Sequence, residues 1–373
     1  MKVLYVCTEL FPLLKTGGLG DVSGALPPAL REAGCDVRVL LPGFPAIAQG
    51  VGPSPAARPV SLAVPTEWGP RLSGAALRMP PRLVQAGLPG NGLGVYVLDA
   101  PALFMREGNP YLDLHDDNAL RFALLGWAAS CLGHGLDPDW QPDVIHCHDW
   151  HTGLAPVYLR QMAMPGPPPA ATVFTIHNLA YQGTFPASAF RHLGLPDYLF
   201  GLHGLEFFGQ VSFLKAGIRS ADRITTVSPT YAREIMHPLQ GCGLDGLLRE
   251  RGAQVSGILN GVDYAVWNPA SDEALPRPYD ADRPEGKAAA KAALQEAMGL
   301  APRPSAMLFG VVSRLTEQKG LHLVEAAMDA LVGMGAQLVV LGMGDPPLEE
   351  AFLRASRRHP GQVCTRIGYD EPL

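Results

Sequence analysis

The chain has 373 residues, more than one hydrophobic core usually serves, so two domains are expected. Its net charge of -6 and its 17% of charged residues offer no basic surface, which argues against nucleic acid as a partner. It contains no run of about 18 uncharged apolar residues free of Gly and Pro, and no small-residue cleavage site, so neither a membrane span nor secretion is expected. The six cysteines are scattered without a Cys-x-x-Cys pair, which is typical of free thiols in the cytoplasm.

The first stretch of the chain combines a strand, a glycine turn and a helix start. Residues 3–7 form a short apolar run that predicts a buried strand, and a helical pattern begins at about Asp21. Between them lies KTGGLGD, in which glycines 17, 18 and 20 let a backbone approach a ligand and leave N–H groups free for an anion, while Lys15 adds a positive charge. This combination predicts a phosphate cradle; the alternative is a turn that simply needs glycine.

Neither standard nucleotide motif fits this turn. A Walker loop places its lysine after the glycines, whereas Lys15 precedes them. A dinucleotide fingerprint needs a tight Gly-x-Gly-x-x-Gly directly after the strand, but Gly18-x-Gly20 is followed by glycine only at Gly24.

The middle of the chain continues the alternation of strands and helices. We expect strands at 37–41 and 94–98 and a buried helix at 118–132. The Pro- and Gly-rich region between 50 and 94 is expected to be irregular and to contain a hairpin of short β segments near 60–64 and 75–79.

Polar side chains follow two further predicted strands. Residues 143–147 lead into HDWHTGL, and residues 172–176 lead into His177-Asn178. His146, His148, Asp149 and His151 invite a metal interpretation, but zinc-binding spacings and closing ligands are absent, so no metal is predicted. Polar groups at the carboxyl ends of parallel strands instead indicate a ligand crevice.

A second α/β series follows a polar, Pro-rich segment at 268–284, so we place the domains at 1–255 and 256–373. Before the boundary we expect a helix at 213–220, a strand at 223–227, a helix capped by Ser228 and a strand at 255–259. After it we expect helices at 286–298, 322–332 and 348–357 and strands at 306–312, 337–341 and 362–367.

Arg314 and Lys319 follow the strand at 306–312 and form a second candidate cationic cradle; the alternative is two solvated surface charges. A separate Gly342-x-Gly344 is too weak a signal to add a nucleotide site. Two doubly wound domains that bring Lys15, Arg314 and Lys319 to one cleft would suit a leaving diphosphate. Because no Ser-His-Asp triad or carboxylate pair is evident, transfer from a phosphate-activated donor is favoured over hydrolysis.

The chain resembles the bacterial glycogen synthases and plant starch synthases, retaining glycosyltransferases of the GT-B fold. The resemblance rests on motifs that occur in the family's order and spacing: KTGGLGDV, HCHDWHTGL, TIHNLAYQG, SPTYAREI, ILNGVD and SRLTEQKG. It implies two Rossmann-like domains that face a cleft. It also implies transfer of glucose from ADP-glucose to the non-reducing end of an α-1,4-glucan such as glycogen, without a cofactor.

The resemblance also implies roles for individual residues. Lys15, Gly18 and Asp21 would lie at the donor site or beside the acceptor, and His177 would contact the transferred sugar. Asn260 would line the cleft, Arg314 and Lys319 would hold the donor diphosphate, and Asp149 would belong to the active-site motifs.

One family motif has no counterpart. Relatives carry Glu-Pro-Cys-Gly-Leu, whose glutamate contacts the donor sugar, whereas here Glu371-Pro372 is followed by Leu373. We therefore expect an incomplete second domain with uncovered apolar faces and a truncated chain whose own activity is open. Two other functions stay open: an NAD-linked oxidoreductase, which would need a tight glycine fingerprint, and a non-catalytic glucan-binding remnant. The sequence leaves the preference for ADP- or UDP-glucose, the oligomeric state and the regulation undetermined.

Overall fold

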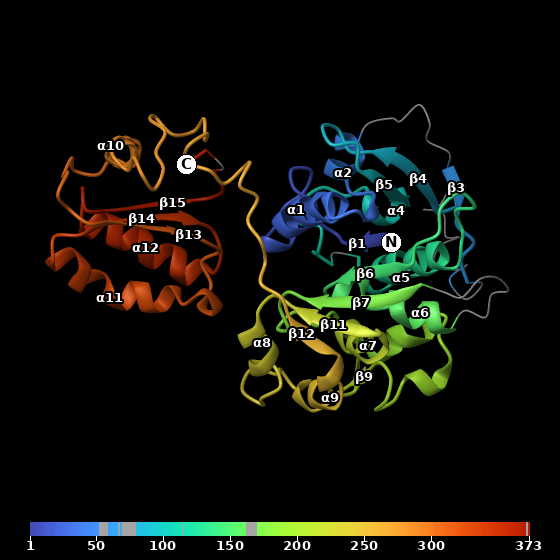
Figure 1. Cartoon of the computed structure of the whole chain (residues 1–373). Coiled ribbons are helices and arrows are strands. Elements are labelled where there is room, and N and C mark those ends of the chain that lie inside the picture. The colour runs from blue at the N-terminus through green and yellow to red at the C-terminus, as the bar shows by residue number, and fades with distance from the viewer. Residues whose placement is uncertain (52–58, 66–67, 69–79, 114, 162–169, 371) are drawn as a thin grey trace. The chain divides into compact units, whose positions relative to one another are not determined.

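A computed structural model describes the chain except residues 52–58, 66–67, 69–79, 114, 162–169 and 371. The chain divides into two compact units, Met1–Gly261 and Val262–Leu373 (Figure 1), each of which is described here by itself. The first unit extends past the expected boundary at 255, because the strand β12 (Val255–Gly257) pairs with β11 (Arg223–Thr226) of the first sheet.

The first unit is built on a sheet of nine strands among the described residues, in the order β12-β11-β7-β6-β1-β2-β5-β4-β3. Every pairing from β12 to β5 is parallel, and β4 and β3 add an antiparallel edge. The strands not yet given are β1 (Lys2–Val6), β2 (Asp36–Pro42), β3 (Pro59–Ser61), β4 (Arg82–Gly87), β5 (Gly94–Asp99), β6 (Val144–His148) and β7 (Ala171–Ile176). The chain order reverses between β1 and β6, which is where such sheets bind ligands.

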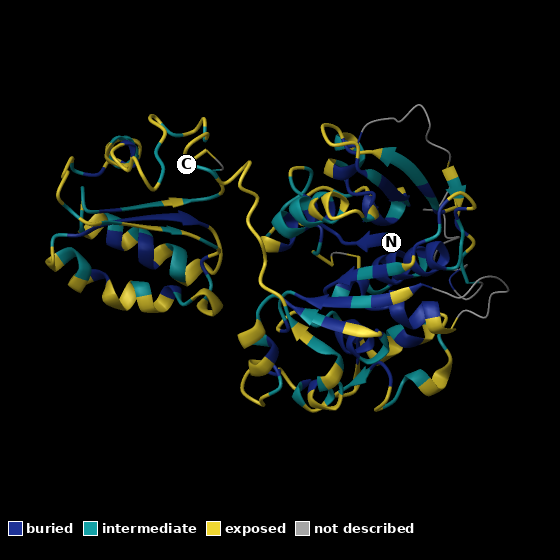
Figure 2. Ribbon diagram, viewed as in Figure 1, coloured by how far each residue is buried: buried dark blue, intermediate teal, exposed yellow. Residues whose placement is uncertain are grey.

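Helices cover this sheet because their apolar residues need a partner surface. The helix α5 (Asn118–Gly133) is buried along almost its whole length and packs against β2, β6 and α6. The other helices among the described residues of this unit are α1 (Gly18–Glu32), α2 (Pro45–Gly50), α4 (Pro101–Phe104), α6 (Ala155–Gln161), α7 (Phe213–Ser220), α8 (Pro229–Glu234) and α9 (Asp245–Glu250). Figure 2 shows the central strands in the dark blue of buried residues. Ser228 caps α8 as predicted, since its hydroxyl accepts the amides of Thr230 and Tyr231.

The expected hairpin near residue 60 forms with a different partner. The strand β3 pairs with β4, at 82–87, while the β segment expected at 75–79 lies outside the described residues. A small antiparallel sheet, β8-β10-β9, was not predicted; it joins Thr184–Pro186, Gln210–Ser212 and Glu206–Phe207. The described part of the unit also contains short 3₁₀ turns at Trp150–Thr152, Ala187–His192, Asp197–Leu199 and Gly252–Gln254.

The first helix starts earlier than predicted, at Gly18 rather than near Asp21. Glycine is a poor helix former, so the sequence pattern places the start after the glycines. However, the first turn of a helix needs no intrahelical partner for its amides, and glycine is tolerated there. Gly17 takes the capping position in an extended conformation.

The second unit is a smaller parallel sheet, ordered β13-β14-β15 among the described residues. Figure 1 shows α11 and α12 on one face of it and α10 on the other. Its elements are α10 (Gly286–Ala297), β13 (Leu308–Val312), a 3₁₀ turn (Glu317–Lys319), α11 (Leu321–Gly333), β14 (Gln337–Gly342), α12 (Pro346–Arg358) and β15 (Val363–Ile367).

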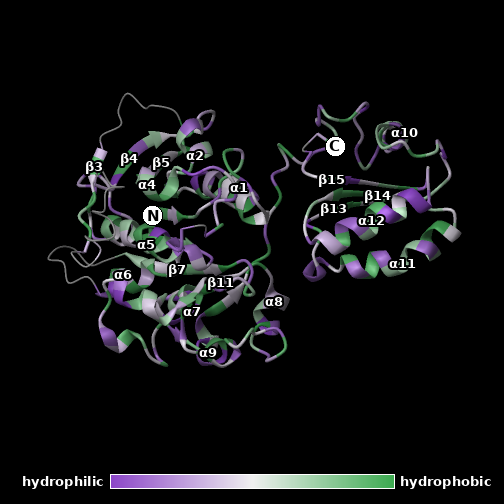
Figure 3. Ribbon diagram, turned by 180° about the vertical axis from the view of Figure 1, so that it is seen from behind, coloured by the Kyte–Doolittle hydropathy of each residue, from purple (hydrophilic) through white to green (hydrophobic). Residues whose placement is uncertain are grey.

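Alternation along β14 explains the two-sided packing of the second unit. Leu338 and Val340 join a core with residues of α11 and α12. Val339 instead joins a separate core with Met298, the residue after α10, and Leu294 of α10 packs against it. Figure 3 shows polar and apolar residues alternating along α12. The edge strand β13 leaves apolar side chains open, including Val312, which is 77% exposed.

Candidate active site

The loops that follow β1, β6 and β7 lie side by side at the reversal point of the sheet. The adjacent strands end at Val6, His148 and Ile176, so the residues after them meet at one edge of the sheet. These loops carry the predicted residues Lys15, Asp149 and His177.

A buried carboxylate that sequence reasoning missed organises the glycine turn. Glu9, 3% exposed, accepts hydrogen bonds from the backbone N–H of Thr16 at 2.6 Å and of Gly17 at 3.2 Å. The hydroxyls of Thr16 and Tyr111 donate to its Oε1 at 2.6 and 2.5 Å. The available signal was an acidic residue directly after a buried apolar run, where a lone charge would be costly.

This arrangement corrects the prediction that the amides of all three turn glycines are free for an anion. The amide of Gly17 is taken by Glu9, and that of Gly20 donates to the carbonyl of Gly17 at 3.1 Å. The first-turn amide of Gly18 is the one that points out of the helix. A Cβ added to Gly18 would meet nothing within 4 Å, so its surroundings are open.

Lys15 and Asp21, two predicted site residues, form an ion pair with each other. Lys15 Nζ lies 2.9 Å from Asp21 Oδ1, and the two side chains are 22% and 38% exposed. The same ammonium lies 5.5 Å from the centroid of the Phe11 ring. Because a partly exposed pair is held by little free energy, Lys15 can exchange this carboxylate for a ligand anion at low cost.

Asp149 has a left-handed backbone conformation, with φ of 56°, that side-chain-bearing residues rarely adopt. Its buried carboxylate accepts the amide N–H of His177 at 2.7 Å and that of Asn178 at 3.4 Å. Burial raises the pKa of Asp149 to about 7, although these hydrogen bonds oppose the shift. The strained residue therefore fixes the start of the loop after β7.

Three histidines predicted from the two strand ends lie together. The rings of His146 and His148 are 4.2 Å apart, as expected for alternate residues on one face of a strand. His148 Nδ1 lies 2.9 Å from His177 Nε2, and His146 Nε2 lies 2.7 Å from Thr175 Oγ1. Burial lowers the pKa of His146 and of His177 to about 4, so these rings are neutral near pH 7.

His151 and Gly153 of HDWHTGL pack against neighbouring side chains and backbone. The ring of His151 lies 4.4 Å from that of Tyr111 and 5.0 Å from that of Phe122. Gly153 lies against the Phe213 carbonyl, where a Cβ would approach within 2.0 Å. Within the described residues, no group of three or more His, Cys, Asp or Glu is arranged to hold a metal ion.

In the second unit, Arg314 and Lys319 are exposed and follow the carboxyl end of β13. The neighbouring Gly342 and Gly344 serve packing: a Cβ on Gly342 would lie 1.9 Å from the Ser313 carbonyl oxygen. The amide of Gly344 donates to Glu349 at 2.7 Å. Asn260, exposed, follows β12 at the end of the first unit.

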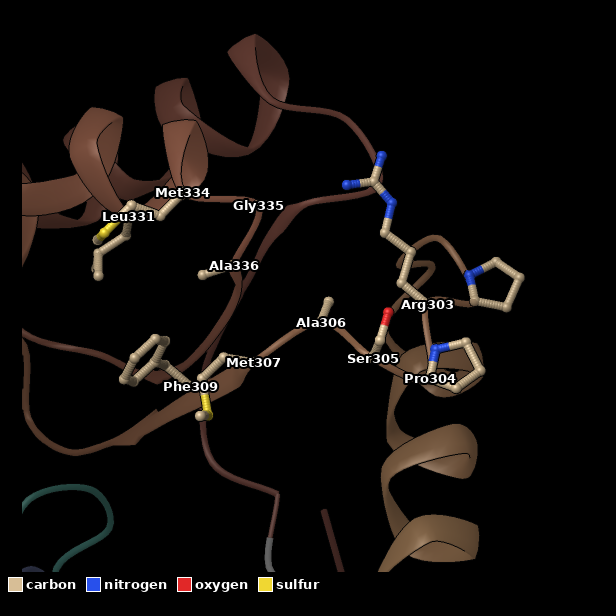
Figure 4. Close-up of a pocket in the computed structure, with 11 residues that line it drawn as sticks. Arg303, Pro304, Ser305, Ala306, Met307, Phe309, Leu331, Met334, Gly335 and Ala336 are labelled. Atoms are coloured by element: carbon tan, nitrogen blue, oxygen red, sulfur yellow. The ribbon is translucent and has the colours of Figure 1, made fainter.

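A pocket of about 830 Å³ in the second unit is unrelated to these residues. Figure 4 shows side chains of β13 and of the end of α11 around it, with Met307, Phe309, Leu331 and Met334 among them. Its lining residues 302–307 and 335–336 lie at the amino ends of β13 and β14, the edge opposite to Arg314 and Lys319.

Outside the undescribed ranges, no helix is both long and apolar enough to cross a bilayer. All six cysteines are free thiols.

Comparison with known proteins points to one group of enzymes. A family model described as the starch synthase catalytic domain matches residues 2–250. The whole chain is 60% identical to a glycogen synthase of Albidiferax ferrireducens and 53% identical to one of Leptothrix cholodnii, and it covers 75% of each. The catalytic domain of starch synthase IV from Arabidopsis thaliana, solved bound to ADP and acarbose, superimposes with a TM-score of 0.81 at 30% identity. That match covers 99% of this chain and 74% of the other.

Proposed function

The chain belongs to the glycogen and starch synthase family, whose reaction is glucosyl transfer, and from this premise we propose which residues carry that reaction here. ADP-glucose is the proposed donor and the non-reducing end of an α-1,4-glucan such as glycogen the acceptor. The observation that carries the proposal is the set of loops at the reversal point between β1 and β6, where Lys15, Asp149 and His177 follow neighbouring strands.

The proposed donor-binding residues are Lys15, Asn260, Arg314 and Lys319. Lys15, next to the open backbone of Gly18, exchanges its bond to Asp21 for a phosphate oxygen. For Arg314 and Lys319, after β13, we propose binding to the donor diphosphate, and for Asn260 a place in the donor site. Opposite charge placed where the leaving group gains negative charge lowers the barrier of the transfer.

The transfer itself needs no protein nucleophile. The bond between the sugar C1 and the donor phosphate breaks while a bond forms from C1 to the acceptor 4-hydroxyl oxygen. The proton of that hydroxyl passes to the departing phosphate, so the acceptor adds on the same face and the configuration at C1 is retained. His177, neutral because burial lowers its pKa to about 4, acts as a hydrogen-bonding contact for the sugar. Asp149 holds the amide of His177.

We also propose a cytoplasmic location, which the free thiols favour, and no role for nucleic acid or a membrane. The NAD alternative loses support because Gly18 lies inside the first turn of α1 and not in a tight turn directly after β1.

The proposal is tested with radiolabelled ADP-glucose and glycogen. We expect label in precipitated glycogen, α-anomeric linkages in the product by proton NMR, and slower labelling with UDP-glucose. Glucan co-sedimentation without any transfer would favour the glucan-binding alternative instead.

A further inference from the structure

Glu9 stands out because it is a buried acid that accepts hydrogen bonds from four donors, and none of these donors carries a positive charge. Its donors come from two distant parts of the chain: Thr16 and Gly17 of the glycine turn, and Tyr111 from the loop before α5. A carboxylate is retained in such a place only when its oxygens are well satisfied, and here they are.

Tyr111 contacts the loops that follow both β1 and β6. Its hydroxyl also lies 2.9 Å from Thr8 Oγ1, on the loop after β1. Its ring lies 4.4 Å from that of His151, on the loop after β6, and its carbonyl accepts the side-chain amide of Asn118 at 2.8 Å. Tyr111 thus links the two loops on either side of the reversal point.

We propose that Glu9 and Tyr111 are positioning residues that hold the turn Thr16–Gly18 in its donor-binding conformation. The inference rests on the proposed function, since it assigns the turn to the nucleotide diphosphate. Thr16 and Gly17 lie between Lys15 and Gly18, so fixing their amides fixes the two groups proposed to meet the phosphate. A turn that is already ordered before binding loses less conformational entropy when the ligand arrives.

The hydrogen bonds that Glu9 accepts from Thr16, Gly17 and Tyr111 are called the clamp here. Two substitutions of Glu9 show whether the clamp acts through its geometry or through its charge. In Glu9→Gln, the amide oxygen can still accept the two backbone N–H groups at the Oε2 position, and the new NH₂ can donate to the hydroxyls of Thr16 and Tyr111. Glu9→Ala removes every one of these bonds. A role in geometry therefore predicts that the Gln variant is tolerated and the Ala variant is not.

Asp137 provides a matched control. It is a buried carboxylate, 3% exposed, that accepts a tyrosine hydroxyl, from Tyr96 at 2.6 Å, together with Arg38 and Gln85. It lies just before β6, at the opposite edge of the sheet from Glu9. Asp137→Ala should lower the melting temperature without changing the affinity for ADP.

The experiment measures ADP binding to the whole chain by calorimetry, with the melting temperature and the KM for ADP-glucose of each variant. Glu9→Ala should raise the Kd for ADP by about tenfold. This factor corresponds to the free energy of roughly one charge-assisted hydrogen bond, which no longer orders the turn. Tyr111→Phe should raise it by about threefold, and Glu9→Gln should stay within about threefold of the unchanged chain. The KM for glycogen should not move.

The outcomes separate this inference from the proposed function. Glu9→Ala with unchanged ADP affinity but a melting temperature lowered as in Asp137→Ala would overturn the positioning role. Equal losses in Glu9→Ala and Glu9→Gln would also overturn it, since they would point to charge. If the wild-type chain binds ADP but transfers no glucose, the proposed function fails. The ADP affinities of the variants still show whether Glu9 and Tyr111 position the turn. No binding of ADP by the unchanged chain would overturn both.

Discussion

At the scale of single residues, the buried histidines make the chain sensitive to acid. Burial lowers the pKa of His146 and His177 to about 4 and that of His148 and His151 well below the ordinary value. In the unfolded chain all four titrate near about 6.5. Below that pH the unfolded state binds more protons than the folded state, so stability falls as the pH drops.

Asp149 acts in the opposite direction. Its folded pKa of about 7 means that the folded chain gains a proton on acidification that the unfolded carboxylate takes up only near pH 4. The proton that Asp149 binds in the folded state offsets the proton that one of the four histidines binds in the unfolded state. Lowering the pH therefore still destabilises the folded chain. We expect the free energy of unfolding to fall by a few kcal/mol between pH 7.5 and 5.5, at roughly 1.4 kcal/mol per proton and pH unit.

Urea denaturation at both pH values checks this expectation. His146→Gln keeps a hydrogen-bond partner for Thr175 but cannot titrate. The number of protons taken up on unfolding at low pH should therefore fall by about one, and the slope of stability against pH should fall with it. His322→Gln, on the exposed surface of α11, is the matched control for replacing a histidine. An identical pH dependence in all three proteins would contradict the assignment.

Lys319 supplies a prediction about turnover. Lys319→Ala should lower the rate of glucose transfer by about one to two powers of ten, because a charge-assisted hydrogen bond is worth about 1.5 to 3 kcal/mol. Glucan binding, measured by co-sedimentation, should change much less. Lys287→Ala on α10, also exposed, is the matched charge removal, and unchanged turnover in Lys319→Ala would refute the diphosphate role.

At the scale of elements, the loops after β13 and β14 depend on each other. The amide of Leu315 donates to the Met343 carbonyl at 2.9 Å, and that of Asp345 donates to the Leu315 carbonyl at 2.8 Å. This close approach is possible because Gly342 and Gly344 carry no side chain. The glycines of this Gly-x-Gly thus support the loop that carries Arg314.

Gly342→Ala should displace that loop, since the new Cβ would lie 1.9 Å from the Ser313 carbonyl oxygen. We expect a loss of about 1 to 3 kcal/mol in stability, the usual cost of overpacking, and slower transfer. Gly310→Ala on β13 is the control, because its Cβ would meet nothing within 4 Å. Thermal denaturation and the glycogen-labelling assay measure both effects; equal behaviour of the two variants would count against the loop packing.

At the scale of the whole molecule, each unit has its own hydrophobic core. Among the described residues, the largest buried cluster draws only on residues up to Val255, and the other two clusters draw only on residues from Leu294 onward. The segment after β12 is exposed, and Figure 2 shows it in yellow. Such a boundary favours independent folding of the parts.

A fragment of residues 1–261 should therefore fold alone. We expect a cooperative urea transition with a midpoint close to that of the same unit in the whole chain. We also expect no glucose transfer, because the residues proposed to bind the diphosphate, Arg314 and Lys319, are missing. Tryptophan fluorescence reports the transition, since Trp68, Trp127, Trp140 and Trp150 lie in this unit. A fragment without a cooperative transition would show that the first core needs the second unit.

The sequence by itself determined the α/β class, the order of nearly all strands and helices, and the strand-end positions of His177, Arg314 and Lys319. Local periodicity and punctuation by Gly and Pro carry that information, because buried strands and amphipathic helices leave residue-by-residue patterns. The family motifs indicated the reaction in the same way.

Only the tertiary structure decided the clamp of Glu9 on the glycine turn, the pairing of Lys15 with Asp21, and the cap that Asp149 provides to His177. It also moved the start of α1 to Gly18 and brought Tyr111 to a carboxylate 102 residues away in the chain. These contacts join segments that are distant in sequence, and no local pattern encodes which donor will meet which acceptor once the sheet has formed.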